Sequence, residues 1–362
     1  MHYLYEFEEF INENILREYE ALLKKIIFIK KSSINENKGD CKTEREFAIN
    51  RNCMHELYLA YSIEEDFDKD LQFPDDTPIL YCGGIDDESK RFLEKFKIKE
   101  ENMYNTISEM QFSCSKSEFS KMFDMYDWQP KTVFNIEDAL NTLKFPIIAK
   151  VDNGHSGVGI KIFKTANELK NFSQPFDING VKHNFKLYSE YIDIDREYRT
   201  IFLKDKCIII NERIANIKTN KTVETKEIEE NVDFIYIVSD MNKVSNEFKN
   251  KLYNIAKEIR KKIKLGLWAI DVVVDKQGNM YVLEINSAPG LGSEKLAQIY
   301  CAIYEDYYGT SLSRKFKEEL NKKYISQSRK EVLKYYKREI AKSPWAIDYD
   351  AIDKKYNYIE YK

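Results

Sequence analysis

The chain has 362 residues, of which 43% are hydrophobic and 33% are charged. Domains usually hold about 100–200 residues, so we expect two or three lobes with cores of their own. The 57 basic residues are balanced by 61 acidic ones, and a net charge of -4 gives no overall positive field for nucleic acid. The six cysteines form no CxxC pair and only four histidines are present, which argues against a structural zinc site.

The same composition bears on where the protein works. No apolar run approaches the about 20 residues that cross a bilayer. The first residues, MHYLYEFEEF, are acidic and lack a basic-then-apolar signal pattern. Scattered cysteines suit a reducing compartment. We therefore expect a cytoplasmic protein without a membrane partner.

The first 112 residues predict a small α/β lobe. Apolar residues at helical spacing predict a helix over residues 5–25, and a short strand follows at residues 26–29. A polar, irregular loop is expected over residues 32–52. The run "TPILYCGG" at 77–84 predicts a buried strand that enters a glycine turn, and the acidic start of "DDESKRFLEKF" predicts a helix after it.

A central lobe is expected over residues 113–190. Its elements are a helix in "SKSEFSKMFDMY", ended by Trp128-Gln129-Pro130, then strand "TVF", helix "NIEDALNTL" and strand "FPIIAKV". A glycine-rich stretch, "DNGHSGVGI", leads into strand "GIKIF", helix "TANELKNF" and strand "FKLYSEYI". This alternation predicts an α+β sheet that carries a glycine hairpin.

A C-terminal lobe is expected over residues 191–310. Two adjacent strands, "YRTIFLKDK" and "KCIIINERI", precede a polar loop and a long amphipathic helix over 244–264. A hairpin with a glycine-containing turn, "LWAIDVVVD-KQG-NMYVLEIN", follows. Residues 311–362 form a charged helical tail without recognisable chemistry.

The hairpin carries a candidate metal site. Glu284 and Asn286 are two residues apart, so in a strand they point to the same face, and the hairpin brings Asp271 opposite them. Three hard oxygen ligands at a strand end suit Mg²⁺ bound to substrate phosphates. Apolar neighbours would bury these carboxylates, which is costly unless cations compensate them. The alternative is a solvent-facing edge hairpin of alternating polarity.

A lysine before the glycine-rich stretch is the second candidate. Lys150 ends an apolar strand, and Gly154, Gly157 and Gly159 follow it with Ser156 among them. Glycines let backbone N–H groups approach phosphate oxygens, so strand, glycine loop and strand predict a flap over a nucleotide. The pattern is neither a Walker loop nor a dinucleotide fingerprint. The alternative is an ordinary glycine hairpin beside a surface lysine.

A third element is the segment "YSEYIDIDREYRTIFL". Glu190 to Ile192 could offer hydrogen bonds to an adenine edge. Glu197 and Arg199 alternate on one strand face, where a carboxylate suits ribose hydroxyls and a guanidinium suits phosphate oxygens. An exposed strand face with glutamate and arginine is common, so this segment is a weak indication alone.

Taken in order, these motifs resemble the ATP-grasp superfamily. The lysine with its glycine flap, then "EYI" and Glu-x-Arg, then Asp271 and "VLEINSAPGLG" are most similar to the carboxylate–amine ligase branch, which holds ribosomal-protein glutamate ligases and D-alanine–D-alanine ligases. The resemblance covers about residues 113–300. It implies a three-lobed α+β fold that holds ATP between two α+β lobes, with a divergent N-terminal α/β lobe.

The resemblance implies a nucleotide site. The residues assigned to cofactor binding at the phosphate end of ATP are Lys116, Lys150, Gly154, His155, Ser156, Gly157 and Gly159. Lys121 is a rival for the role of Lys116. His155 departs from the family's small flap residues and is either a solvent-exposed tip, which we favour, or a γ-phosphate contact. The adenine pocket would be lined by Glu190, Tyr191 and Ile192, and Glu197 would hold the ribose.

The resemblance also implies the metal and the chemistry. Asp271, Glu284 and Asn286 would bind a pair of Mg²⁺ ions, or Mn²⁺ in their place. Arg199 and Arg213 would act with Lys150 on the transferred phosphoryl group, and Ser287 to Gly290 would border the amine.

The expected activity is ATP-dependent joining of a small-molecule or peptide carboxylate to an amine through an acyl phosphate, with ADP and phosphate released. The alternatives are an ATP-grasp kinase acting on a small molecule and a nucleotide-binding protein without catalysis. A homodimer is left open.

Overall fold

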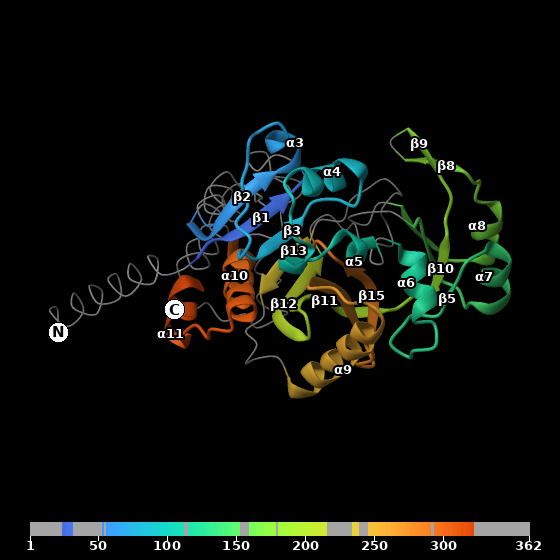
Figure 1. The fold of residues 1–362 in the computed structure, drawn as a ribbon. Coiled ribbons are helices and arrows are strands. Elements are labelled where there is room, and N and C mark those ends of the chain that lie inside the picture. The colour runs from blue at the N-terminus through green and yellow to red at the C-terminus, as the bar shows by residue number, and fades with distance from the viewer. Residues whose placement is uncertain are drawn as a thin grey trace, which may run out of the picture. The chain divides into compact units, whose positions relative to one another are not determined.

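The computed structural model describes residues 24–31, 53, 56–111, 115–152, 159–178, 180–215, 234–238, 245–290 and 293–321 (Figure 1). By their contacts these residues form two units. The first takes the described residues up to Tyr104 together with those from Gly290 onward, and the second takes Asn105 to Pro289. The lobe boundaries at residues 112, 190 and 310 stay predictions. No helix in the described ranges is long and apolar enough to cross a membrane.

The first unit is built on a parallel sheet of order β2-β1-β3-β4. Its elements are β1 (Ile26–Lys30), β2 (Tyr58–Ser62), α3 (Ile63–Asp66), β3 (Ile79–Cys82), α4 (Asp87–Lys95), a 3₁₀ turn (Glu100–Asn102), β4 (Met103–Tyr104), α10 (Ser293–Tyr308) and α11 (Arg314–Asn321). All five residues of β1 are buried, and residues 26–29 form the continuous apolar run that is typical of a parallel strand.

Helix α10 joins this sheet although it lies far along the chain. The Tyr58 hydroxyl donates to the Leu296 carbonyl at 2.7 Å, and the Tyr300 hydroxyl donates to the Lys24 carbonyl at 2.9 Å. The predicted strands at 26–29 and 77–84 and the helix after the second are confirmed. The predicted helix at 5–25, the loop at 32–52 and the tail beyond Asn321 lie outside the described residues.

The second unit begins with a sheet of order β5-β10-β6-β7 and its helices. The elements are α5 (Ile107–Gln111), α6 (Lys116–Met122), β5 (Thr132–Val133), α7 (Ile136–Thr142), β6 (Ile147–Lys150), β7 (Ile160–Phe163), α8 (Ala166–Asn171), β8 (Phe176–Ile178), β9 (Val181–His183) and β10 (Leu187–Glu190). Ile147, Ala149 and Phe163 are buried in one cluster with Ala139 of α7 and Leu169 of α8. By alternation, the other face of β6 carries Lys150.

The second unit continues with an antiparallel sheet of order β13-β12-β11-β14-β15. Its elements are β11 (Ile194–Leu203), β12 (Lys206–Ala215), β13 (Phe234–Val238), α9 (Asn246–Lys262), β14 (Leu267–Asp275) and β15 (Met280–Asn286). Helix α9 packs Leu252, Ile255 and Ile259 onto the face of the sheet that carries Trp268 and Ile270. The predicted amphipathic helix at 244–264 and the predicted hairpin are thus confirmed.

One predicted helix is too long. It was expected to continue to Trp128, but α6 ends at Met122 and turns follow. The reason is an aromatic cluster: Phe119 and Phe123 pack against Trp128, with ring centroids 6.5 and 5.1 Å from it. A continuing helix would carry Trp128 away from these rings. The Trp128 carbonyl instead accepts a hydrogen bond from the Val282 amide at 2.9 Å, which fastens this turn to β15.

Candidate active site

Polar side chains form a row across one face of the second unit's five-stranded sheet. The antiparallel register places Arg199 opposite Asn211 on one side and opposite Asp271 on the other, and Asp271 lies opposite Glu284. Directly opposite residues in antiparallel strands share a face. The helix α9 cluster occupies the other face, so this polar row runs Asn211, Arg199, Asp271, Glu284 across four strands.

Arg199 and Asp271 form a bidentate ion pair in this row. Nε of Arg199 donates to Oδ1 of Asp271 and Nη2 donates to Oδ2, both at 2.7 Å. The two side chains are 16% and 3% exposed. Two parallel charge-assisted hydrogen bonds are the strongest geometry open to an arginine, and they offset the cost of burying the carboxylate.

The Glu284 carboxylate lies close to two cations, Lys116 and Arg199. Oε2 of Glu284 lies 3.5 Å from the Lys116 ammonium, and Oε1 lies 3.9 Å from Nη2 of Arg199. Asn286, two residues on, approaches Oε1 with its amide nitrogen at 3.5 Å. The Glu284 carboxylate therefore lies between the Lys116 ammonium, the Arg199 guanidinium and the Asn286 amide. This end of β15 is where the sequence predicts a metal site.

The chemistry of this donor set fits a divalent cation. Asp271, Glu284 and Asn286 supply hard carboxylate and amide oxygens, which Mg²⁺ prefers. Among the described residues there is no group of three or more His, Cys, Asp or Glu side chains placed to hold a metal, and this donor set has two carboxylates and one amide. The cations Arg199 and Lys116 now neutralise the two carboxylates.

Lys150, at the end of β6 in the β5-β10-β6-β7 sheet, lies near Glu284 and Lys116. Burial of its ammonium lowers the pKa of Lys150 to about 8, and the nearby charge of Lys116 lowers it further, while Glu284 and Glu197 oppose the shift. In the described ranges its ammonium makes no hydrogen bond or ion pair. A cation held close to others without a partner of its own is suited to an anionic ligand.

Asp152, at the base of the glycine stretch, fastens this lysine to helix α6. Its carboxylate accepts hydrogen bonds from the Ser117 amide at 2.8 Å and from the Ser115 and Ser117 hydroxyls at 3.1 Å. Lys116 lies between these serines, so Asp152 holds Lys116 near Lys150.

Of the two lysines that competed for one role, Lys116 is the one placed at the site. The Lys121 ammonium pairs with Glu118 of its own helix at 2.9 Å and both side chains are more than half exposed, at 52% and 63%. Lys116 is 17% exposed and faces Glu284.

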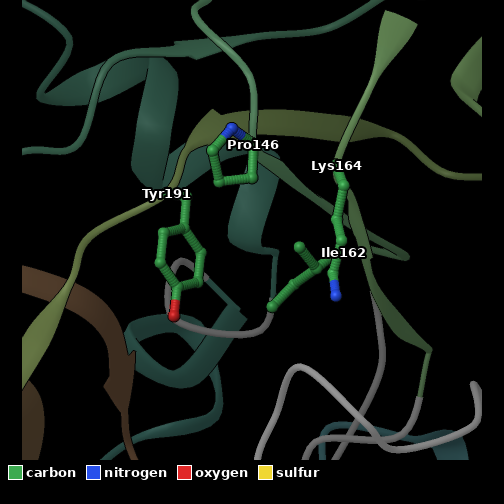
Figure 2. A pocket seen from close by; sticks show the side chains of 4 residues that line it. All are labelled: Pro146, Ile162, Lys164 and Tyr191. Atoms are coloured by element: carbon green, nitrogen blue, oxygen red, sulfur yellow. The ribbon is translucent and has the colours of Figure 1, made fainter. Parts of the chain in front are cut away.

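An apolar pocket lies on the face of strands β6 and β7 that carries Lys150, at the end of β6 away from Lys150. Figure 2 shows Tyr191 and Pro146 on one side of the space and Ile162 and Lys164 on the other. The space measures about 240 Å³. The register pairs Lys150 with Ile160 and Ile148 with Ile162, so an apolar strip on one sheet face runs from this pocket to the ammonium.

The other predicted residues divide into placed and undescribed ones. Glu190 turns its carboxylate to the Lys131 amide at 2.9 Å, so this side chain holds two segments of the sheet together. Ile192 is half-buried, and Glu197 lies opposite Arg213 in the β11–β12 register. The Arg213 side chain and the flap residues lie outside the described part of the chain, namely Gly154, His155, Ser156 and Gly157. Gly159 is described. It has a positive φ of 74°, and a side chain at this position would meet the Val151 side chain.

A family model described as "D-ala D-ala ligase C-terminus" matches residues 115–302, which is more than half of the chain and contains every residue of this site. The chain belongs to this family. The D-alanine–D-alanine ligase of Aquifex aeolicus (strain VF5) is 29% identical over 170 residues, covering 46% of this chain and 53% of that protein. The chain therefore matches about half the length of this curated relative.

A solved structure shares the fold of this family member. The crystal structure of D-alanine–D-alanine ligase from Bacillus anthracis superposes with a TM-score of 0.51 and 17% identity, over 86% of this chain and 99% of that one. The fold is therefore the α+β fold of the ATP-grasp ligases, as the sequence motifs indicated.

Sequence patterns did not indicate three residues in or near this site. Asp152 and Asn211 adjoin the site, and Asn105 fixes the end of β15: its amide donates to the carbonyls of Leu267 and Ser287 at 2.6 Å. The sequence held one usable signal, a polar residue inside the apolar run "CIIINERI" that contains Asn211. Asn105 and Asp152 act through contacts distant in sequence, for which no local pattern exists.

Proposed function

We propose that this protein is an ATP-dependent carboxylate–amine ligase that works through an acyl phosphate and releases ADP and phosphate. The observation that carries this proposal is the meeting of Lys116, Lys150 and Arg199 around the carboxylates of Asp271 and Glu284. Cations beside hard oxygen ligands suit phosphoryl transfer, in which the charge on a moving phosphoryl group must be offset.

ATP would lie along the apolar strip of β6 and β7. The adenine would sit at the pocket beside Tyr191, with Ile162 against its ring, and Glu190 and Ile192 would border it through the chain around Tyr191. The phosphates would then reach Lys150 at the other end of the strip. Glu197 would take the ribose hydroxyls, and the flap from Gly154 to Gly159 would cover the phosphates with its backbone amides.

Divalent cations would be held by Asp271, Glu284 and Asn286. Mg²⁺, or Mn²⁺ in its place, would supply charge neutralisation for the β- and γ-phosphates. Lys116 and Arg199 now pair with these carboxylates. With nucleotide bound, the phosphate oxygens would give Lys116 and Arg199 a further anionic partner.

The reaction would run in two displacements. A carboxylate oxygen of the substrate attacks the γ-phosphorus, the bond to the bridging oxygen breaks, and ADP leaves. The amine then attacks the acyl carbon, the C–O bond to phosphate breaks, the amine loses a proton, and phosphate leaves with the oxygen that came from the carboxylate. Arg199 and Arg213 would orient the phosphoryl group, and the backbone from Ser287 to Gly290 would border the amine.

The substrates are a small-molecule or peptide carboxylate and an amine, with no nucleic acid or membrane partner. A homodimer remains open and can be read from the mass in solution. The test is an ADP-release screen of the purified protein with ATP, Mg²⁺, pooled carboxylates and pooled amines, followed by mass spectrometry of the products. Hydroxylamine replaces the amine in a parallel arm, and a hydroxamate should accumulate. A stable phosphorylated alcohol, with ADP but no phosphate, would instead identify a kinase, and no ADP at all a nucleotide-binding protein.

A further inference from the structure

Asn211 carries a buried amide that the proposed chemistry leaves unused. Its side chain is fully buried, and neither Nδ2 nor Oδ1 has a hydrogen-bond partner among the described residues. It stands at the end of the polar row, directly opposite Arg199, and on its other side β12 pairs it with Val238 of β13.

An amide in this state destabilises a fold, because its polar atoms have left water without gaining partners. Ile209, two residues before it on the same face of β12, is apolar and buried, so a leucine would suit this position. Buried polar atoms without partners that adjoin a site are a reason to look for a ligand. Its cross-strand neighbour Arg199 keeps 16% of its side chain exposed.

We propose that Asn211 binds the acyl-donor substrate of the proposed ligase and selects one that carries a neutral amide close to its carboxylate, as in a peptide or an N-acyl amino acid. This inference rests on the proposed function. A carboxamide has one acceptor oxygen and two N–H donors, so it pairs fully with a group that offers both a donor and an acceptor. Another amide does so with two reciprocal hydrogen bonds.

The surrounding charges disfavour a free ammonium at this point. The carboxylates of the polar row, Asp271 and Glu284, lie one and two strands beyond Arg199 and are already paired with Arg199 and Lys116. An ammonium against the neutral Asn211 would be buried without a countercharge beside the Arg199 guanidinium. A neutral amide avoids that cost while the substrate carboxylate extends toward Arg199.

The test uses a matched pair of probes with ATP, Mg²⁺ and hydroxylamine, and hydroxamate as the readout. N-acetylglycine carries an amide beside its carboxylate, and levulinate replaces that N–H by a methylene group. The full-length wild type should use N-acetylglycine with a kcat/KM roughly tenfold or more above that of levulinate and of glycine. Asn211→Leu should remove this preference by raising KM for N-acetylglycine, with the KM for ATP unchanged.

A second measurement guards against a merely structural role. Asn211→Leu should unfold at the same temperature as the wild type or higher, because it removes polar atoms without partners. Thr200→Val is the matched control: Thr200 is buried on the other face of β11 and its hydroxyl donates to the Ile270 carbonyl at 3.4 Å, so this variant should lose stability and keep the probe preference.

Four results would overturn the inference, and the last of them would also overturn the proposed function. An Asn211→Leu protein less stable than wild type would show that the amide is held by the fold. Equal use of N-acetylglycine and levulinate by the wild type would do so as well. Turnover of free amino acids without turnover of N-acetylglycine or glycylglycine would overturn the inference and leave the ligase proposal standing. If the wild type forms no hydroxamate from any carboxylate, the proposed function itself fails and the inference falls with it.

Discussion

Arg199 holds Asp271 by two parallel hydrogen bonds of 2.7 Å across neighbouring strands β11 and β14. The carboxylate is only 3% exposed, and these two hydrogen bonds offset part of the cost of its burial. Asp271, which is proposed to bind metal, and Arg199, which is proposed to bind phosphate, therefore form an ion pair with each other without either ligand.

The first prediction concerns that coupling. Arg199→Ala should lower the free energy of unfolding by roughly 3–5 kcal/mol, because the buried Asp271 carboxylate loses this bidentate ion pair. Arg199→Lys should fall between the two proteins, since lysine keeps the charge and loses the fork. Arg196→Ala, at an exposed position of the same strand, is the control and should cost less than about 1 kcal/mol in urea unfolding. Equal stability of the two alanine variants would contradict the assignment.

The second prediction concerns Glu284. Glu284→Gln should remove ADP release and leave the fold intact, because a neutral amide replaces the carboxylate that faces Lys116 and lies opposite Asp271. Asn286→Ala should show a smaller loss, since it removes a neutral ligand. Glu118→Gln is the control, because its exposed carboxylate pairs with Lys121 of the same helix α6. Near-normal ADP release by folded Glu284→Gln would remove the metal assignment.

Local sequence patterns predicted much of this sheet but few of the side-chain contacts that connect its strands. The short turn sets Val272 opposite Val282, and a β-bulge between Asp271 and Val272 then brings Asp271 opposite Glu284, as expected, although no local period encodes that bulge. The pairing of Arg199 with Asp271 and of Lys116 with Glu284 joins residues far apart in sequence, which no local period encodes. The end of α6 was also wrong, because a tertiary aromatic cluster determines it.

The third prediction is a pH dependence centred on Lys150. Its pKa of about 8 lies below the ordinary lysine value, so the ammonium is charged below pH 8 and loses its proton above it. ATP phosphates bind the charged form, so the affinity should be constant below pH 8 and fall by up to about tenfold per unit above it. The decline in ATP affinity should end at the pKa that Lys150 has in the ATP complex. The bound phosphates raise that pKa because they stabilise the charged ammonium.

Titration calorimetry from pH 6.5 to 9.5 measures this dependence. Lys150→Ala should bind ATP weakly at every pH and slow the first turnover. Lys150→Arg, whose charge persists across this range, should bind without the decline above pH 8. Unchanged ATP affinity and single-turnover rate in Lys150→Ala would make Lys150 an ordinary lysine of the sheet surface.

The fourth prediction concerns Asn105, which joins the start of β14 to the end of β15. Its carboxamide makes three hydrogen bonds: Nδ2 donates to the carbonyls of Leu267 and Ser287 at 2.6 Å, and Oδ1 accepts from the Leu267 amide at 3.0 Å. Asn105→Ala should cost roughly 2–4 kcal/mol of unfolding free energy, because three buried groups lose their partner. It should also lower kcat more than it raises the KM for ATP, since Asn286 precedes the freed Ser287.

Asn102→Ala provides the control for that split. Asn102 also bonds through both ends of its amide, to the Asp75 carbonyl and the Tyr307 hydroxyl, but within the first unit. It should lose stability with kcat unchanged per folded molecule. Equal kinetic effects in the two variants would mean that Asn105 acts on stability alone.

The most direct test of the ligase proposal follows one oxygen atom. The pooled carboxylates are exchanged with ¹⁸O-water in acid and supplied with unlabelled ATP, Mg²⁺ and the pooled amines, and the released phosphate is analysed by mass spectrometry. An acyl phosphate requires the carboxylate oxygen to leave with phosphorus, so each phosphate formed should carry one ¹⁸O atom, in equal amount to ADP and amide. Phosphate without ¹⁸O, or ADP formed beside a stable phosphorylated alcohol, would contradict the account.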